Sequence, residues 1–503
     1  MGLDRVSQNS GPKIALIVLS MCLIGAYAAG SSRQPAQGSA SDFELATRIR
    51  TYLAPFAESG NLSGAVLVAR HGRVLMRESY GMANYELSVP NSPRTRFHIA
   101  SVSKAFTAAA ILQLQEEGSL SVSDRVSRFV PDFPRGNEIT LDNLLTHTSG
   151  IPDINDLPDY DTFSRNPHKL SEIIAKFANL PLEYEPGTKY SYSNSNYNLL
   201  AFILETVTRQ AYSEILRRGI LQPAGMTNSG PDGDVAKPIP LAAAGYVPAG
   251  VKGYDKAAYV DWSNKTGNGS LFSTVDDLFR FDRALKAETL LKSSTCRTYF
   301  VEGVGNRYGW YIGRRLGHRV MSAKGRSPGF AAELDRYPDD DLTVILLSNS
   351  YSSVTQDPVA EAIAAIVFGQ TVTVPNVRAA VLPQSILLSY EGHYQFGPDF
   401  FAPDAKFRLI AQPGYLLLQL ANDSRPLVPL SPTEFLERKF FGHIVADEDE
   451  QGKVIGLIVR YGTHDFHALR LDAERAMPAP IPLESQAGHR RRNSPRASSL
   501  RFP

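Results

Sequence analysis

The stretch Phe97–Ala110, FHIASVSKAFTAAA, places a serine and a lysine three residues apart at the start of a helix-like segment. Side chains at i and i+3 lie on one face of a helix, so the Lys104 amine can lie beside the Ser101 hydroxyl. The first N–H groups of a helix have no partner within it, and they can face an oxyanion formed at Ser101. One turn therefore supplies a candidate nucleophile, a base and hydrogen-bond donors. The plain alternative is an N-cap serine beside a surface lysine.

A second polar motif lies in the segment KYSYSNSNYNLLAFILE, which begins at Lys189. Tyr192-Ser193-Asn194 leads directly into a helical pattern, and a tyrosine and an asparagine two residues apart in a tight turn can point into one cleft. The alternative is a polar turn that caps the helix expected from Tyr197.

The third segment, Met321–Phe330, MSAKGRSPGF, has two incompatible interpretations. Gly325-Arg326-Ser327-Pro328-Gly329 fits the G-x-S-x-G nucleophile elbow, which would make Ser327 the catalytic serine. The same residues can instead form a substrate-binding strand that serves Ser101. An elbow requires a helix after the turn, whereas Phe330–Tyr337 is strand-like, so the second interpretation is favoured.

Together these segments resemble the superfamily of serine β-lactamases and penicillin-binding D,D-peptidases, in the branch of class C β-lactamases, D-alanyl-D-alanine carboxypeptidases, D-aminopeptidases and related esterases. GAVLVARHGRVLMRESYGMANYE and ITLDNLLTHTSGIP carry the similarity along with the motifs above, in continuous order from Phe43 to Phe368. The resemblance implies an α+β fold: an antiparallel sheet flanked by helices, with a helical subdomain and a cleft between them.

By position, the resemblance assigns Ser101 as nucleophile, Lys104 as its partner, and Tyr192 and Asn194 as the Y-x-N pair. Either Lys104 or Tyr192 can be the base that takes the serine proton. Their reference pKa values are about 10.4 and about 10, so acting near pH 7 requires a bias of roughly 4 kcal/mol from the surroundings. The sequence leaves this choice open, because the two groups are expected to titrate as a coupled pair.

The family's third motif is K-T-G or H-x-G, and here that position reads Ala323-Lys324-Gly325, without the leading cation. We predict substrate-binding roles for Lys324, Gly325 and Arg326, with the Arg326 N–H as second oxyanion donor. Neighbouring side chains on a strand point to opposite faces, so it is open whether Lys324 or Arg326 replaces the missing cation. Its loss predicts weaker handling of substrates with a terminal carboxylate.

Patterning along the chain predicts two folded units. Helices are expected at Phe43–Phe56, Ser101–Glu117, Leu170–Leu180, Tyr197–Arg209, Val275–Leu285 and Asp357–Phe368, with a hairpin at Ala65–Tyr80 and a strand meander at Trp310–Ser348. Short strands from about Ile386 to Leu471 indicate a small β-barrel, which resembles the lipocalin-like domains of some hydrolases of this branch. The expected organisation is 1–28 signal peptide, 29–42 flexible lead-in, 43–368 hydrolase domain, 369–385 linker, 386–472 barrel and 473–503 disordered tail.

The N-terminus predicts export. Arg5 and Lys13 precede the apolar run Ile14–Gly25, and Ala26-Tyr27-Ala28 follows as a cleavage signal, so a periplasmic or secreted protein is expected. If uncleaved, this segment is a membrane anchor. Removal of Cys22 with it would leave Cys296 as the sole cysteine, which precludes an internal disulfide.

The composition limits which classes of binding partner are expected. Of the 503 residues, 43% are hydrophobic and 20% charged, and a formal net charge of +1 gives no indication of nucleic-acid binding. No span is expected in the mature chain, and neither a cofactor nor a metal: His147 is read as scaffold, and His464 and His467 are expected on a strand, where i and i+3 face opposite ways. The predicted activity is hydrolysis of a small-molecule or peptide ester or amide, as a peptidase, esterase or weak β-lactamase, with the barrel as a candidate for mediating oligomers. The alternative is a non-catalytic peptidoglycan- or peptide-binding protein on the same fold.

Overall fold

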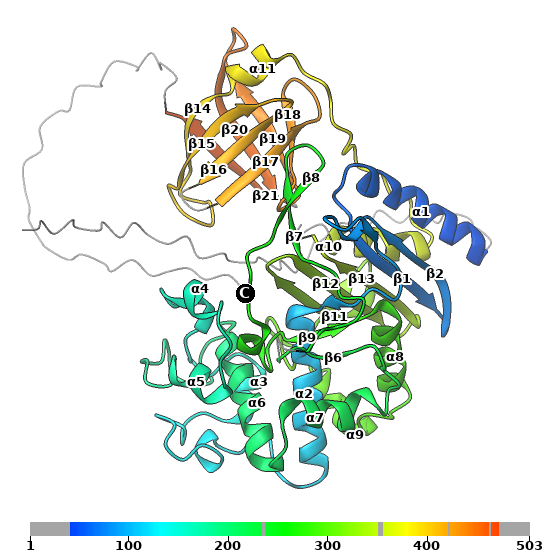
Figure 1. Ribbon diagram of the computed structural model, residues 1–503, viewed down its shortest axis with the longest axis vertical. Coiled ribbons are helices and arrows are strands. Elements are labelled where there is room, and N and C mark those ends of the chain that lie inside the picture. The colour runs from blue at the N-terminus through cyan, green and yellow to red at the C-terminus, as the bar shows by residue number, and fades with distance from the viewer. Residues whose placement is uncertain (1–40, 234–236, 351–355, 421–422, 462–463, 472–503) are drawn as a thin grey trace, which may run out of the picture.

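The computed structural model describes residues 41–233, 237–350, 356–420, 423–461 and 464–471 (Figure 1). The predicted signal peptide, almost all of the lead-in and the predicted tail lie outside these ranges. Within them, no helix combines the length and the apolar character needed to cross a bilayer.

A six-stranded antiparallel sheet forms the centre of the first unit, in the order β10-β11-β12-β13-β1-β2. Its first and last segments in the sequence therefore pair side by side. The predicted hairpin and meander are confirmed. Their bounds are β1 (Gly64–Arg70), β2 (Arg73–Tyr80), β10 (Tyr311–Arg315), β11 (His318–Ser327), β12 (Phe330–Tyr337) and β13 (Leu342–Ser348).

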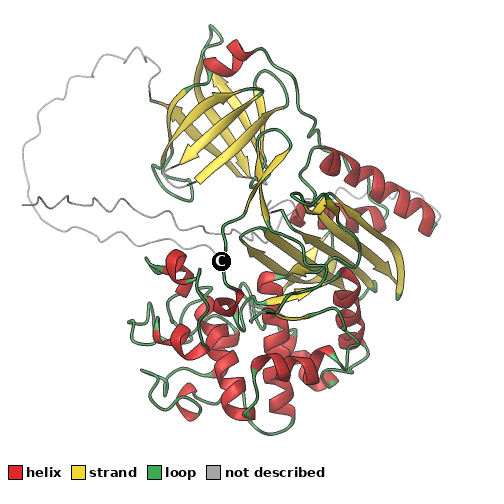
Figure 2. Cartoon of the chain, in the orientation of Figure 1, coloured by secondary structure: helices red, strands yellow, loops and turns green. Residues whose placement is uncertain are grey.

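Helices cover both faces of this sheet (Figure 2). Strand β1 shows why: Ala65 and Leu67 belong to one buried core, and Val66 and Val68 to another, because successive side chains point to opposite faces. Helices α1 (Asp42–Glu58) and α10 (Gln356–Val367) pack in the second core. The first core holds α2 (Ser103–Glu116) and α8 (Val275–Lys286), and extends into the helical subdomain around α6 (Asn194–Thr208).

In the helical subdomain, α6 begins at Asn194, three residues before the predicted Tyr197, whereas another helix is shorter than the sequence predicted. Helix α5 (Leu170–Ala175) ends five residues before the expected Leu180. The chain continues with tighter i→i−3 bonds, such as Phe177 N–H to Ile174 O at 3.1 Å, which end the regular α-helix. The remaining short helices of the first unit are α3 (Leu141–Leu145), α4 (Tyr160–Phe163), α7 (Tyr212–Leu216) and α9 (Ser293–Tyr299).

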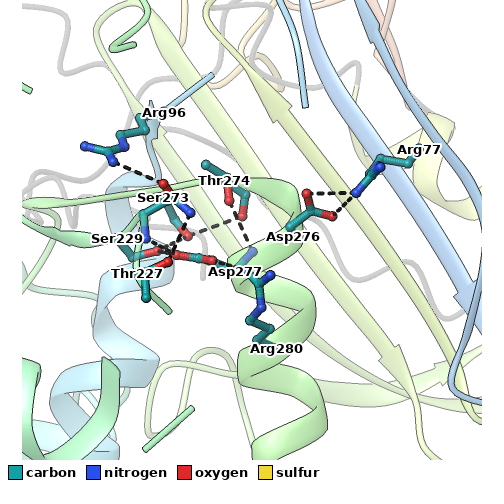
Figure 3. A network of polar contacts seen from close by, with 10 residues as sticks. Arg77, Arg96, Thr227, Ser229, Ser273, Thr274, Asp276, Asp277 and Arg280 are labelled. Carbon is teal, nitrogen blue, oxygen red and sulfur yellow. Dashed lines mark hydrogen bonds and ion pairs between the residues drawn. The ribbon is translucent and has the colours of Figure 1, made fainter. Parts of the chain in front are cut away.

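The start of α8 is fixed by a side-chain cap (Figure 3). The Thr274 hydroxyl accepts a hydrogen bond from the Asp277 N–H at 3.2 Å, and Asp276 pairs with Arg77 of β2. The Asp277 carboxylate also accepts from the Ser229 hydroxyl at 2.8 Å. Acidic side chains in the first turn interact favourably with the helix dipole. Here they also attach α8 to the sheet.

The second unit is the expected small barrel. Its described strands close in sequence order, and its interior is packed with aromatic and aliphatic side chains such as Tyr394, Phe407 and Phe435. One short helix, α11 (Gln384–Ser389), precedes the strands where strand structure was expected from Ile386. The strands are β14 (Gly392–Phe396), β15 (Lys406–Gln412), β16 (Tyr415–Leu420), β17 (Asp423–Pro429), β18 (Glu434–Glu437), β19 (Gly442–Glu448), β20 (Val454–Tyr461) and β21 (His464–Arg470).

A hairpin of the first unit reaches the barrel. Strands β7 (Tyr246–Ala249) and β8 (Gly253–Lys256) pair with each other, and Figure 1 shows them extending from the sheet toward the barrel. The fully buried Arg438, which follows β18, donates to Gly60 O at 2.8 Å and to Ala249 O at 2.8 Å. One barrel side chain thus binds both the end of α1 and the hairpin.

Candidate active site

Ser101 lies in a short 3₁₀ turn, η1 (Ala100–Val102), between strand β5 (Phe97–His98) and helix α2. The hydroxyl-bearing residue is therefore just before the regular helix, rather than inside it as the sequence predicted. Ala100 has a positive φ of 45°, which costs a non-glycine residue about 1–2 kcal/mol. Backbone strain of this kind persists where the surrounding structure enforces it, and it is concentrated at functional sites.

Lys104 points at Ser101 from the first turn of α2. Its Nζ lies 3.1 Å from Ser101 Oγ, 2.8 Å from Asn194 Oδ1 and 2.9 Å from the Asn268 carbonyl oxygen. The side chain is fully buried. The three oxygens fix the position of the amine next to the hydroxyl.

The surroundings favour a neutral Lys104. Burial lowers the pKa of Lys104 well below its usual 10.5, Asp153 opposes this, and the positive charge of Lys265 adds to the lowering. Desolvation dominates because removing water penalises the charged amine, and among the described residues no carboxylate oxygen lies within 4.0 Å of it. A neutral amine has a free lone pair and can accept the serine proton.

Tyr192 approaches the same hydroxyl from the helical subdomain. Its OH lies 2.9 Å from Ser101 Oγ, and its ring lies 4.8 Å from Lys104 Nζ. Burial raises the pKa of Tyr192 well above its usual 10, although the bond to Ser101 acts in the opposite direction. The phenol is therefore protonated near neutral pH.

His147 supports the tyrosine. The two rings stack with their centroids 4.4 Å apart, and His147 Nδ1 accepts from the Ser193 N–H at 3.1 Å. The imidazole is fully buried and does not contact Ser101. This position agrees with its interpretation as scaffold.

Asn194 is oriented by a residue that the sequence analysis missed. Asp153, in the loop after His147, accepts from the Asn194 N–H at 3.1 Å and from its Nδ2 at 3.0 Å. The amide oxygen is thereby turned toward Lys104. No motif marks Asp153, because only the fold brings the two loops together.

Gly325 closes the site on the sheet side. Strand β10 begins opposite Ser322, so the edge of β11 beyond that residue is open to the turn that carries Ser101. A Cβ on Gly325 would lie 2.1 Å from the Ile99 carbonyl oxygen and 2.9 Å from the Ser101 nitrogen. Only glycine permits this approach, which brings the β11 backbone next to the Ser101 N–H. The Ala323 side chain shares this face and is fully buried.

Lys324 and Arg326 differ from the expectation. Lys324 Nζ lies 3.0 Å from Asp357 Oδ2, and an Arg326 guanidinium nitrogen lies 3.0 Å from Asp357 Oδ1. Asp357 belongs to α10, on the opposite face of the sheet from Ala323, and the buried Glu333 lies near both cations. The reason is strand alternation: the side chains next to Gly325 point away from Ser101. Both cations pair with Asp357 on the face away from Ser101, so the geometry favours neither of them as a replacement for the missing cation.

Ser327, the alternative nucleophile, ends β11 at the turn into β12, and no helix follows. Its side chain is buried, and in the described part of the chain its hydroxyl contacts no base. Groups of histidine, cysteine or carboxylate side chains suited to a metal ion do not occur among the described residues either.

Comparison with known proteins agrees with this geometry. Residues 46–368 match the family model described as Beta-lactamase. The putative penicillin-binding protein PbpX of Bacillus subtilis is 32% identical over 286 residues, covering 57% of this chain and 70% of the relative. Penicillin-binding protein 4* of the same organism is 29% identical over 419 residues, covering 78% of this chain and 91% of the relative. The solved octameric penicillin-binding protein homologue from Pyrococcus abyssi superimposes with a TM-score of 0.59 at 23% identity, covering 84% of this chain and 99% of that one.

Proposed function

From the premise that this chain belongs to the beta-lactamase family of serine hydrolases, we propose that it hydrolyses an ester or amide through an acyl-enzyme on Ser101. The observation that carries the proposal is the convergence of three groups on one hydroxyl. Ser101 Oγ lies 3.1 Å from the Lys104 amine and 2.9 Å from the Tyr192 hydroxyl, and the glycine edge of β11 lies against its backbone.

Lys104 acts as the base in the acylation step. Its neutral Nζ accepts the Ser101 Oγ proton as the oxygen forms a bond to the substrate carbonyl carbon. The carbonyl oxygen takes up the electron pair and accepts hydrogen bonds from the Ser101 and Arg326 N–H groups. Such donors cost no reorganisation because the backbone already holds them in place.

Tyr192 acts as the acid toward the leaving group. The tetrahedral intermediate collapses, the bond to the leaving oxygen or nitrogen breaks, and the tyrosine OH donates a proton to that atom. Protonated Lys104 then gives its proton to the Tyr192 phenolate, which restores both groups. A water molecule then attacks the ester carbon. Tyr192 and Lys104 exchange their roles as acid and base in this step, and release of the acid restores Ser101.

The substrate is a small molecule or peptide with an activated or accessible acyl group, which covers peptidase, esterase and weak β-lactamase activity. Penicillin-binding names among the relatives support an acyl donor of the cell envelope. An exported protein fits such a substrate, and the apolar segment before Ala26-Tyr27-Ala28 supports export through a cleaved signal.

Active-site labelling tests the proposal. Purified wild type, Ser101→Ala and Ser327→Ala are treated with a fluorescent fluorophosphonate and, separately, with a fluorescent penicillin. We expect fluorophosphonate labelling of wild type and Ser327→Ala but not of Ser101→Ala. Labelling by the first probe alone indicates an esterase-like enzyme, and labelling by both indicates a penicillin-reactive one. Labelling of Ser101→Ala, or of none of the proteins, contradicts the proposal, and the latter supports the peptide-binding alternative.

A further inference from the structure

A lysine outside all three motifs is separated by one glycine from the turn that carries the nucleophile. Lys265 ends the 3₁₀ turn η5 (Trp262–Lys265), and only 8% of the residue is exposed. Its carbonyl oxygen accepts from the Asn268 N–H at 3.0 Å and from the Gly269 N–H at 2.7 Å. The carbonyl of that same Asn268 accepts from Lys104 Nζ, so Lys265 anchors the loop that holds the base.

The Lys265 side chain begins next to the nucleophile turn. A Cβ on Gly269 would lie 3.5 Å from Lys265 Cβ and 3.6 Å from the Ala100 carbonyl carbon, so Gly269 alone separates the two residues. From there the side chain extends to Tyr160 of α4, where its ammonium lies 5.1 Å from the ring centroid. Its positive charge also reaches Lys104, whose pKa it lowers in addition to the larger effect of burial.

This ammonium has no counter-charge. In the part of the chain that the structure describes, no carboxylate oxygen lies within 4.0 Å of it, and its Nζ makes no hydrogen bond. The contrast with Lys324 is clear, because that equally buried lysine lies between the carboxylates of Asp357 and Glu333. An ammonium without an anionic partner can form a charge-assisted hydrogen bond with an anionic ligand.

We propose that the Lys265 ammonium binds an anionic group, such as a carboxylate, of the acyl donor. Lys265 thereby becomes the specificity-determining cation that the third motif lacks at Ala323, contributed by the Tyr160 side of the site instead of by β11. The inference rests on the proposed function at Ser101 and adds a preference for anionic acyl donors. It reverses the expectation, drawn from Ala323 alone, of poor handling of carboxylates.

Matched chromogenic esters test this preference. The neutral substrate is p-nitrophenyl acetate. p-Nitrophenyl hydrogen succinate carries a carboxylate on the acyl side, and 3-carboxy-4-nitrophenyl acetate carries one on the leaving group. kcat/KM is measured for wild type, Lys265→Gln, Lys265→Arg and the control Lys292→Gln, which removes an exposed lysine. Circular dichroism and fluorophosphonate labelling establish that each variant is folded and has a reactive serine.

We expect Lys265→Gln to lose about tenfold or more in kcat/KM on one of the two anionic esters, the loss expected for a charge-assisted hydrogen bond. Its loss on the neutral ester should be much smaller, so the ratio of anionic to neutral kcat/KM should fall in Lys265→Gln, whereas Lys265→Arg and Lys292→Gln should keep the wild-type ratio. An equal loss on all three esters, or no loss, overturns the inference. If Ser101→Ala loses every activity but Lys265→Gln shows no change in selectivity, the proposed function stands and only the inference about Lys265 is wrong. Hydrolysis by Ser101→Ala removes the proposed function itself.

Discussion

Lys104 sets the pH range in which Ser101 can react. Because burial lowers the pKa of Lys104, its amine is neutral above a pH well under the ordinary lysine value of 10.5. We expect kcat/KM on a neutral ester to rise with pH through this lowered pKa and to level off above it. Lys104→Arg, which is protonated at every accessible pH, should lower kcat by about 10²–10⁴-fold. A variant that keeps wild-type kcat would show that Tyr192 or another group is the base.

The same lysine should lower the stability of the fold. The unfolded chain has an ordinary lysine pKa, so between the lowered folded value and that ordinary value the unfolded state binds more protons. The wild type therefore gains stability as pH rises through this window. Methionine does not titrate, so the free energy of unfolding of Lys104→Met minus that of wild type should decrease from pH 7 toward pH 10. Urea titrations at several pH values measure it, and a difference that does not vary with pH would mean that folding leaves this pKa unchanged.

Individual residues were predictable where a motif carries them. Ser101, Lys104, Tyr192 and Asn194 were found from spacing and resemblance, and the structure brings all four together. Asp153 and the carbonyl of Asn268 were not found, because a buried carboxylate and a backbone oxygen act through contacts that only the tertiary fold creates. Lys324 and Arg326 were assigned by proximity in sequence, which alternation along a strand does not preserve.

At the scale of elements, the approach of strand β11 to the turn η1 decides whether the site assembles. Gly325→Ala would place a methyl group 2.1 Å from the Ile99 oxygen, so strand and turn must separate. We expect kcat/KM to fall by about 10²-fold or more, the cost of misplacing groups by an ångström. Gly313→Ala in β10 is the matched control, since an added Cβ there meets no atom within 4 Å. If both variants are equally active, the oxyanion donors must lie elsewhere.

Elements with long, mostly apolar runs were predicted to within a few residues, and α2 and β12 are examples. Nearly every residue of both is buried, so composition and packing agree. The turn η1 was not predicted, since it depends on Ala100 adopting a positive φ that alanine does not favour by itself. The early end of α5 likewise follows from tertiary packing around Phe177, which is buried.

At the scale of the whole molecule, the barrel is attached near the site. The hairpin β7–β8 leaves the first unit at Gly245, where an added Cβ would lie 3.0 Å from Gly329 Cα in the turn after β11. Its other end meets Arg438 of the barrel. No motif in the sequence pointed to this link, because Arg438 acts by binding backbone carbonyls. A movement of the barrel can therefore reach the turn next to Gly325 through only a few residues.

Arg438 should hold the two units together. It is fully buried and donates to four carbonyl oxygens as well as to Asn61 Oδ1 at 3.3 Å. Arg438→Ala removes this donor from all five acceptors, of which Gly60 O keeps the Tyr254 hydroxyl, so we expect a loss of about 3 kcal/mol and faster proteolytic cleavage in residues 370–383. Arg438→Lys should restore only part of this stability, because an ammonium lacks the planar fork that reaches several carbonyls. Arg460→Ala is the control: its exposed pair with Asp465, at 2.7 Å, should contribute no more than about 1 kcal/mol. If Arg438→Ala matches wild type in thermal unfolding and protease resistance, other contacts, such as Phe56 with Phe441, fasten the barrel.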